Sequence, residues 1–254
     1  MTDQARLAVL IDAENVPGQY ADAAFAEMAT YGALSVKRAY GNWALPTLSP
    51  WVDHLSPQAI QPVQQFGWVK RKNASDSALI IDAMDLLYAG HLDGFCLLSS
   101  DSDFTRLATR LRESGMTVYG LGERKTVESF VKACDRFVYL EVLPQPTASA
   151  TSDVPPGLTG VDVPKDAARV PDLLVALTPA IVAAQGDTGW SRTSDVGQHL
   201  RRTHADFDPR NYGYRNMREA VNATEGLDVE EIVDPSGAVH VWVRVRKGGP
   251  DPVS

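Results

Sequence analysis

Acidic side chains follow two short apolar stretches of the chain, at the points where each stretch ends. Asp12 comes directly after the stretch 7–11, and Asp101 and Asp103 come just after the stretch 95–98. If both stretches are parallel strands, their carboxyl ends meet at one edge of a sheet, where open α/β sheets bind ligands. We therefore expect carboxylates from two strands to lie together at this edge.

Two further aspartates belong to a helix predicted over residues 75–91. Asp76 falls in its first turn, and Asp82 lies about 120° further around the helix at ~100° per residue. The two side chains point in different directions, yet both can border one cleft. Asn15 follows Asp12 closely enough for its amide to orient a water molecule or a carboxylate.

Carboxylates gathered without Lys or Arg between them repel one another, and a hard divalent cation relieves that repulsion. Oxygen ligands suit Mg²⁺ or Mn²⁺. Such a centre binds a phosphodiester oxygen, lowers the pKa of a bound water and stabilises the leaving oxygen. Each acid taken alone is equally consistent with helix capping or with solvation. Their joint placement favours a metal centre.

Other phosphate chemistries lack their motifs. The segment 120–126 has Arg124 where a phosphate-binding loop needs Gly before the Lys, and no glycine-rich turn follows the first predicted strand. A phosphatase that uses an Asp-x-Asp pair is disfavoured because Glu14 takes the second position. The histidines are dispersed, so the sequence gives no support to a histidine-based metal site.

Apolar periodicity places these acids in an alternation of strands and helices. This alternation predicts an α/β domain over residues 1–143, with a mainly parallel sheet covered on both faces. The expected strands are 7–11, 34–40, 95–98, 117–121 and 137–140, the expected helices are 20–31, 75–91, 102–113 and 126–134, and 43–68 combines a short helix with a strand.

The rest of the chain predicts a linker and a second domain. Residues 144–168 are rich in Pro, Thr, Ser and Gly without apolar periodicity, which is typical of a flexible linker. Residues 169–247 predict a small winged-helix domain, and 248–254 a tail. Its expected elements are helices at 172–184 (bent or interrupted at Pro179), 194–203 and 214–223, and strands at 227–233 and 239–245, with Trp190 and Trp242 in the core.

Charge and composition limit the partners and the compartment. The net charge is −8, and neither predicted domain is basic overall, so nucleic acid would be held by local patches or through a metal. No apolar run approaches ~20 residues, and the first residues lack the pattern of a signal peptide. Cys96 and Cys134 fit buried thiols in a reducing compartment. We expect a cytoplasmic protein without membrane association.

Several of these motifs, taken in order, resemble the NYN domain, the LabA-like branch of the PIN-like nuclease superfamily. They are Leu10-Ile-Asp-Ala-Glu-Asn15, Lys72-Asn-Ala-Ser-Asp76 running to Asp82, Leu98-Ser-Ser-Asp-Ser-Asp-Phe104, Gly120-Leu-Gly122 and Ala133-Cys-Asp-Arg-Phe137. The resemblance implies a Rossmann-like PIN-type fold, a divalent metal and RNA cleavage. It implies as metal ligands and catalytic residues Asp12, Asp76, Asp82, Asp101 and Asp103, with Asn15 as a catalytic polar partner. The chain departs from the family at Ser99-Ser100, where Gly is usual.

Residues 169–246 resemble the OST-HTH (LOTUS) domain. The supporting residues are Leu173-Leu174, Thr188-Gly-Trp190, Val196-Gly-Gln-His-Leu200, Phe207 and Tyr212-Gly-Tyr214. That family is associated with RNA binding, so the resemblance implies RNA as a partner of this domain.

Basic residues within each of the two predicted domains suggest where RNA is bound. Lys70, Arg71 and Lys72 precede the helix of Asp76 and could grip a phosphate backbone, although a solvated run is equally open. In the second domain the predicted RNA-binding residues are Arg201, Arg202, Arg210, Arg215 and Arg218, with Tyr212 either stacking on a base or packing a helix junction.

The sequence therefore predicts a metal-dependent ribonuclease that hydrolyses phosphodiester bonds of single-stranded RNA, with the second domain selecting or retaining the RNA. Two alternatives stay open: a nuclease-silent RNA-binding regulator, and an adaptor whose winged helix binds a protein partner. Endonucleolytic or exonucleolytic cleavage, and self-association into a homo-oligomer, also stay open.

Overall fold

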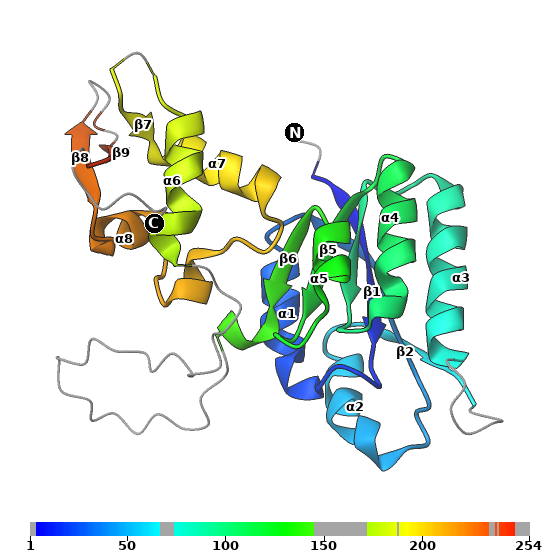
Figure 1. Ribbon diagram of the computed structural model, residues 1–254. Coiled ribbons are helices and arrows are strands. Elements are labelled where there is room, and N and C mark those ends of the chain that lie inside the picture. Colours follow the sequence, from blue (N-terminus) through cyan, green and yellow to red (C-terminus); the bar gives the residue numbers. More distant parts are fainter. Residues whose placement is uncertain are drawn as a thin grey trace, which may run out of the picture. The chain divides into compact units, whose positions relative to one another are not determined.

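The computed structural model describes residues 4–66, 74–144, 172–186, 188–233, 237 and 239–246 (Figure 1). The chain divides into two compact units, residues 1–150 and 151–254, which we treat separately. Most of the predicted linker, the basic residues Lys70, Arg71 and Lys72, and the predicted tail lie outside the described residues.

The first unit is built on a six-stranded sheet in which every strand pair is parallel. The strand order is β3-β2-β1-β4-β5-β6. The central strand β1 is apolar between Arg6 and Asp12 and buried after Arg6, and β4 is buried along its whole length, as expected for strands covered on both faces. The strands are β1 (Arg6–Asp12), β2 (Ala33–Gly41), β3 (Gln61–Gln64), β4 (Gly94–Leu98), β5 (Thr117–Gly122) and β6 (Arg136–Tyr139).

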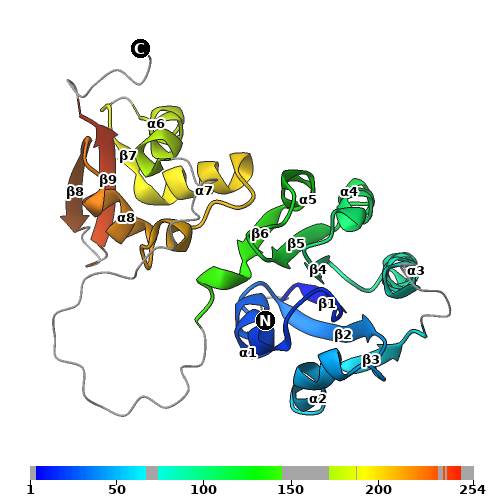
Figure 2. The same ribbon diagram turned by 60° about the horizontal axis from the view of Figure 1, so that its bottom comes forward.

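Helices cover both faces of this sheet (Figure 2). Alternate residues of β1 enter two separate cores: Val9 and Ile11 pack with Phe25 and Trp51 of the α1 and α2 side, while Leu10 packs on the other face with the α3, α4 and α5 side. The predicted α/β fold with a parallel sheet is confirmed. The helices are α1 (Ala21–Met28), α2 (Ser49–Leu55), α3 (Ala74–Ala89), α4 (Thr105–Glu113) and α5 (Glu128–Ala133).

Short 3-10 turns join several of these elements, and one of them matters for the site. The predicted helix 102–113 begins as the 3-10 turn η3 (Ser102–Phe104) and continues as α4. Asp101 caps η3, because its carboxylate accepts a hydrogen bond of 2.9 Å from the amide of Asp103.

Among its described residues, the second unit has three α-helices and a three-stranded antiparallel sheet of order β7-β9-β8, which is the winged-helix arrangement expected. Helix α6 runs through Pro179 without a break, so of the two effects predicted for this proline, a bend or an interruption, the interruption does not occur. The two-residue strand β7 was not expected. The elements are α6 (Leu173–Ala183), β7 (Ser191–Arg192), α7 (Thr193–Thr203), α8 (Met217–Ala223), β8 (Leu227–Val233) and β9 (Val239–Val245).

The tryptophans of the second unit do not lie in its core, so that prediction is wrong. The core is formed by residues such as Leu177, Ile181 and Val243, whereas Trp190 and Trp242 are only half-buried. The physical reason is the strand alternation of β9: Val243 points inward, so its neighbour Trp242 points to the other face.

Within the part of the chain that the structure describes, no helix is both long enough and apolar enough to cross a lipid bilayer.

Candidate metal centre

The topology of the first unit singles out one edge of the sheet. From β1, the sheet continues to β2 and β3 on one side and to β4, β5 and β6 on the other. Such a switch point opens a crevice at the carboxyl ends of the strands. Asp12 is the last residue of β1, and Asp101 follows the end of β4, so both lie at this crevice.

Three aspartates from two elements meet there. Each of Asp76, Asp101 and Asp103 offers a carboxylate oxygen, and these oxygens all lie within 4.8 Å of one another. Asp76 comes from the first turn of α3, while Asp101 and Asp103 come from the cap and first turn of η3. Capping by Asp101 and membership of the cluster are therefore compatible.

Asp12 is the most buried acid of the site, with 1% of its surface exposed. Its Oδ2 accepts hydrogen bonds of 2.8 Å from both the Asn15 amide and the Ser99 hydroxyl. Its Oδ1 is buried and has no hydrogen-bond donor among the described residues. Burial raises the pKa of the Asp12 carboxyl, and the charge of Asp101 raises it further. A buried oxygen without a donor beside other acids is suited to a cation.

The pKa of the Asp76 carboxyl is raised by its burial and by the acids around it. Its pKa is raised from 3.8 to about 6, first by burial and then by the negative charges of its neighbours. Those neighbours are Asp12, Asp101, Asp103 and Glu14. The electrostatic contacts show that Asp12 belongs to the same acidic environment as the three clustered aspartates.

Ser99 connects the two strands that carry the acids. Its hydroxyl donates to Asp12 and accepts a hydrogen bond of 3.0 Å from the amide of Asp101. Ser100 points its hydroxyl to the next loop, where it accepts a hydrogen bond of 2.8 Å from the Glu123 amide. Ser99 and Ser100 thus connect the loops at this edge of the sheet.

Asp82, which the sequence analysis predicts as a metal ligand, is not among the three clustered aspartates and has partners of its own. Its Oδ2 pairs with Arg38 at 2.8 Å and accepts a hydrogen bond of 2.8 Å from the Tyr40 hydroxyl. Both partners belong to β2. The charge of Asp82 is therefore balanced by a neighbouring guanidinium, and we leave this residue out of the proposed metal ligands.

Glu14 is a member of the site that the sequence analysis missed. One of its carboxylate oxygens accepts a hydrogen bond of 2.7 Å from Ser75, and the other accepts one of 3.1 Å from the Asn42 amide. Glu14 thus joins the loop after β1 to the first turn of α3. Its position two residues after a strand-end aspartate was the available signal.

A basic loop also lies at this edge. Arg124 and Lys125 follow β5, and the loop is held against β4 by the bond from Glu123 to Ser100. Lys125 is 68% exposed and pairs with Glu123. Because loops after parallel strands share one edge, the order of the strands could have indicated this placement.

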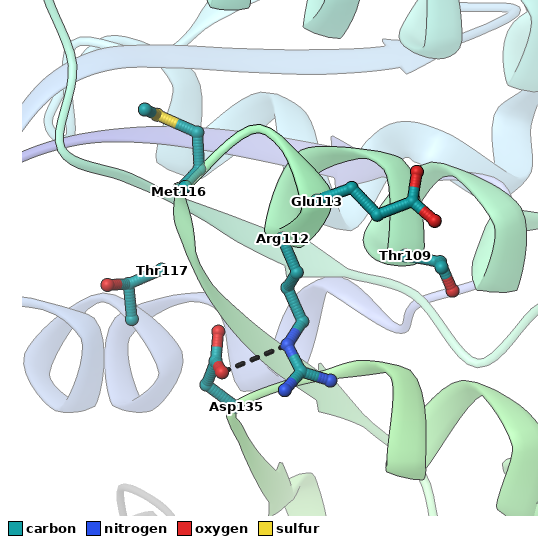
Figure 3. A pocket seen from close by; sticks show the side chains of 7 residues that line it. Thr109, Arg112, Glu113, Met116, Thr117 and Asp135 are labelled. Atoms are coloured by element: carbon teal, nitrogen blue, oxygen red, sulfur yellow. Dashed lines mark ion pairs between the residues drawn. The ribbon is translucent and has the colours of Figure 1, made fainter.

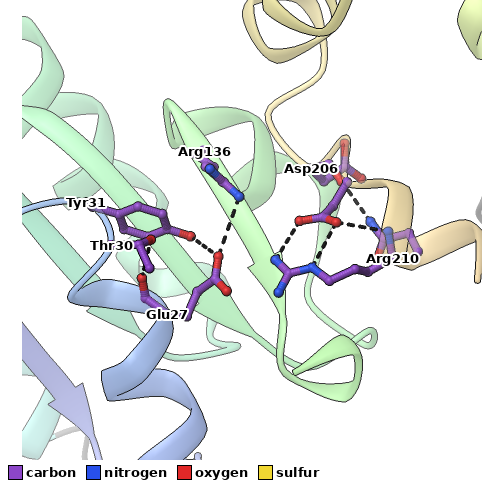
Figure 4. Close-up of polar contacts among 8 residues, drawn as sticks. Glu27, Thr30, Tyr31, Arg136, Asp206 and Arg210 are labelled. Atoms are coloured by element: carbon purple, nitrogen blue, oxygen red, sulfur yellow. Dashed lines mark hydrogen bonds and ion pairs between the residues drawn. The ribbon is translucent and has the colours of Figure 1, made fainter. Parts of the chain in front are cut away.

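The opposite edge of the sheet holds an open depression of about 580 Å³, lined by Arg112, Met116, Thr117 and Asp135 among others (Figure 3). The Asp135 carboxylate in this depression already has two partners. It pairs with Arg112 at 2.9 Å and accepts a hydrogen bond of 2.8 Å from the Val118 amide. Nearby, Arg136 stacks on Tyr31 at 4.9 Å and pairs with Glu27 (Figure 4). These contacts are structural and lie away from the acids.

The predicted RNA-binding residues of the second unit differ in how they are engaged. Arg201 and Arg202 are exposed in the last turn of α7, without an ion pair within the described part of the chain. The other three arginines pair with acids: Arg210 with Asp208 at 2.6 Å, Arg215 with Glu219 at 3.3 Å, and Arg218 with Glu231 at 3.6 Å.

Tyr212 packs inside the second unit. Its ring lies 5.8 Å from that of Phe207, and burial raises the pKa of its hydroxyl to about 12. This contact supports the packing alternative for Tyr212 over base stacking.

Comparison with known families gives two matches. The family model of the NYN domain matches residues 6–141, and that of the OST-HTH/LOTUS domain matches residues 165–238. No curated protein matches the chain.

Several solved structures are similar to parts of the chain. A protein of unknown function from Vibrio parahaemolyticus is 20% identical, with a TM-score of 0.45, over 55% of this chain and 94% of that one. A Chromobacterium violaceum protein is 33% identical, with a TM-score of 0.28, over 32% of this chain and 88% of that one. An uncharacterized Nitrosomonas europaea protein is 22% identical, with a TM-score of 0.27, over 37% of this chain and 97% of that one.

Proposed function

The chain belongs to the NYN domain family and carries an OST-HTH/LOTUS domain after it, and from this premise we propose that it is a metal-dependent ribonuclease. The observation that carries the proposal is the buried Asp12 Oδ1, which lacks a donor among the described residues and lies in the acidic environment of Asp76 and Asp101. Hydrolysis of RNA phosphodiester bonds is the reaction proposed.

The donor set fits a hard divalent cation. Every candidate ligand is a carboxylate oxygen, from Asp12, Asp76, Asp101 and Asp103, which favours Mg²⁺ or Mn²⁺ over softer metals. When bound, such an ion supplies a water of lowered pKa and positive charge for the phosphate and the leaving oxygen. The raised pKa of Asp76 is consistent with this fit: burial raises it most, the neighbouring negative charges raise it further, and a bound cation would offset both effects.

The remaining residues of the edge position these ligands. Asn15 and Ser99 both donate a hydrogen bond to Oδ2 of Asp12. These two bonds fix the orientation of the carboxylate and leave Oδ1 as the oxygen that would bind the metal. Glu14 holds the first turn of α3, and with it Asp76, through Ser75. Arg124 and Lys125 on the adjacent loop are the cations that we assign to the substrate phosphates, with Lys125 shared between them and Glu123.

The second domain is proposed to retain RNA. The support is the OST-HTH match together with exposed Arg201 and Arg202 on α7, which are available for phosphate contacts. Single-stranded RNA is the proposed substrate, because a strand without a partner can enter the crevice and reach the edge of the sheet.

Hydrolysis of labelled single-stranded RNA by the purified protein, in Mn²⁺ and in chelator, tests the proposal. We expect Mn²⁺-dependent cleavage that falls at least about 100-fold in Asp12→Asn and in Asp101→Asn, since each removes a charge on which transition-state stabilisation depends. Asp85→Asn is the matched control, because Asp85 is an exposed acid on α3 outside the cluster.

Two results would contradict the proposal. Cleavage that survives in chelator or in both cluster variants would exclude the metal centre as its source. RNA binding without any cleavage would favour a nuclease-silent regulator instead.

A further inference from the structure

The sheet of the second unit has an outer face that the core does not use. Along β9, Val241, Val243 and Val245 pack into the core. Strand residues alternate between faces, so Trp242 and Arg244 lie on the opposite, outer face. Arg192 of β7 stands beside Trp242 in the strand register.

Arginine and tryptophan side chains are stacked on each other across this face. The guanidinium of Arg192 lies 5.2 Å from the ring centre of Trp242, and that of Arg244 lies 4.5 Å from the ring centre of Trp190. These are cation–π distances. Both tryptophans are half-buried, while Arg192 and Arg244 are exposed. Each guanidinium is therefore held in a defined place at the surface.

Asp228 of β8 fixes the positions of two arginine side chains on the same face. It stands opposite Arg244 in the register, and its two oxygens accept hydrogen bonds of 3.0 Å from Arg244 and from Arg246. One carboxylate thus orients two guanidinium groups. An exposed arginine with its rotamer already fixed loses less conformational entropy on binding a ligand.

We propose that this Trp–Arg face, formed by Trp190, Arg192, Trp242, Arg244 and Arg246, binds single-stranded RNA by stacking unpaired bases and contacting phosphates. The inference rests on the proposed role of the second domain in retaining RNA. Unpaired bases stack on aromatic rings and on guanidinium planes, and both are present here in adjacent pairs. Arginine also neutralises the backbone phosphates.

Charge distinguishes this face from α8 and its approach, although not from α7, where Arg201 and Arg202 have no ion pair among the described residues. On α8 and its approach, Arg210, Arg215 and Arg218 each pair with a carboxylate of their own. The Trp–Arg face carries three positive charges, from Arg192, Arg244 and Arg246, and two negative charges, from Asp228 and Glu230 of β8. The face is therefore positive in a domain that is acidic overall. This excess favours a polyanion over a neutral protein surface as the occupant.

The test measures binding of a short fluorescein-labelled single-stranded RNA to the full-length protein by fluorescence anisotropy, in chelator so that no RNA is cut. We expect the double variant Arg192→Gln/Arg244→Gln to bind at least about 10-fold more weakly, with a slope of log affinity against log salt smaller by about 1.4. Trp242→Leu should weaken binding about 10-fold through lost stacking, with an unchanged salt slope.

Two controls separate these effects from misfolding and from simple loss of charge. Trp242→Phe keeps an aromatic ring and should bind within about 3-fold of the unchanged protein. Arg110→Gln/Lys132→Gln removes the same charge from α4 and α5 and should leave the affinity unchanged. Thermal unfolding of each variant verifies the fold.

The outcomes distinguish this inference from the ribonuclease proposal. If the unchanged protein binds RNA and the Trp–Arg variants keep full affinity, the face is not the binding surface, while the ribonuclease proposal stands. The same conclusion follows if only Arg201→Gln/Arg202→Gln loses affinity. If the unchanged protein neither binds nor cleaves RNA, both proposals are overturned.

Discussion

The Ser99 hydroxyl and the Asp12 carboxylate are joined by a hydrogen bond of 2.8 Å that connects two neighbouring central strands, β1 and β4. The same hydroxyl accepts from the Asp101 amide. One buried side chain therefore sets the relative position of two acids from distant parts of the sequence. If these acids hold a metal, Ser99 is a positioning residue for that site.

Replacement of Ser99 by Ala should weaken metal-dependent cleavage without abolishing it. Asp12 would keep only the Asn15 donor, and the Asp101 amide would lose its acceptor, so we expect a decrease of about 10-fold in rate at limiting Mn²⁺. The measurement is the rate of RNA cleavage across a Mn²⁺ titration. Ser102→Ala in the same loop is the control, since Ser102 is exposed. Equal rates for Ser99→Ala and the unchanged protein would refute the positioning role.

Asp82→Asn should affect stability and leave metal binding intact. The substitution removes the charge paired with Arg38 and weakens the bond to the buried Tyr40 hydroxyl, which should lower the free energy of unfolding by about 1–3 kcal/mol. Urea denaturation measures this loss, and a Mn²⁺ titration should give an affinity within about 2-fold of the unchanged protein. An intact stability with lost Mn²⁺ affinity would return Asp82 to the metal site.

The metal-free protein should lose stability as the pH rises through the titration of Asp76. Its pKa in the folded state is raised to about 6 from an ordinary value of 3.8. The folded state then binds more protons between these values than the unfolded state, so the free energy of unfolding falls as the pH increases.

The variant Asp76→Asn should remove this dependence. In chelator at neutral pH it should be more stable than the unchanged protein by on the order of 1–2 kcal/mol, because a neutral amide avoids both the burial of a charge and the repulsion from the other acids. Thermal unfolding from about pH 4 to about pH 7 gives the comparison. Mn²⁺ should stabilise the unchanged protein more than the variant. A variant that is less stable than the unchanged protein in chelator would argue against repulsion at this site.

Much of the fold and of the site follows from local sequence patterns. Strand-end positions were enough to predict that Asp12, Asp101 and Asp103 share one edge, because that rule depends only on parallel topology. The first-turn position of Asp76 followed from the start of an amphipathic helix. The hairpin strands β8 and β9 have the residue ranges that alternation predicted.

Two placements depend on different physical causes. The partners of Asp82, Arg38 and Tyr40, are more than 40 residues away in the sequence, so a local pattern does not reveal this ion pair, and whether Asp82 binds the metal stays a prediction. Trp242 was placed in the core, whereas the alternation of Val241, Val243 and Val245 along β9 directs it outward. That alternation is visible in the sequence and could have corrected the placement.

The most direct test of the account is to locate the metal itself. A crystal of the protein soaked in Mn²⁺ and measured for anomalous scattering would reveal the ion by its own signal. The account predicts an anomalous peak in contact with carboxylate oxygens of Asp76, Asp101 and Asp103, with Asp12 Oδ1 facing it. A peak elsewhere, or no peak among these four acids, would contradict the metal centre and with it the proposed hydrolysis.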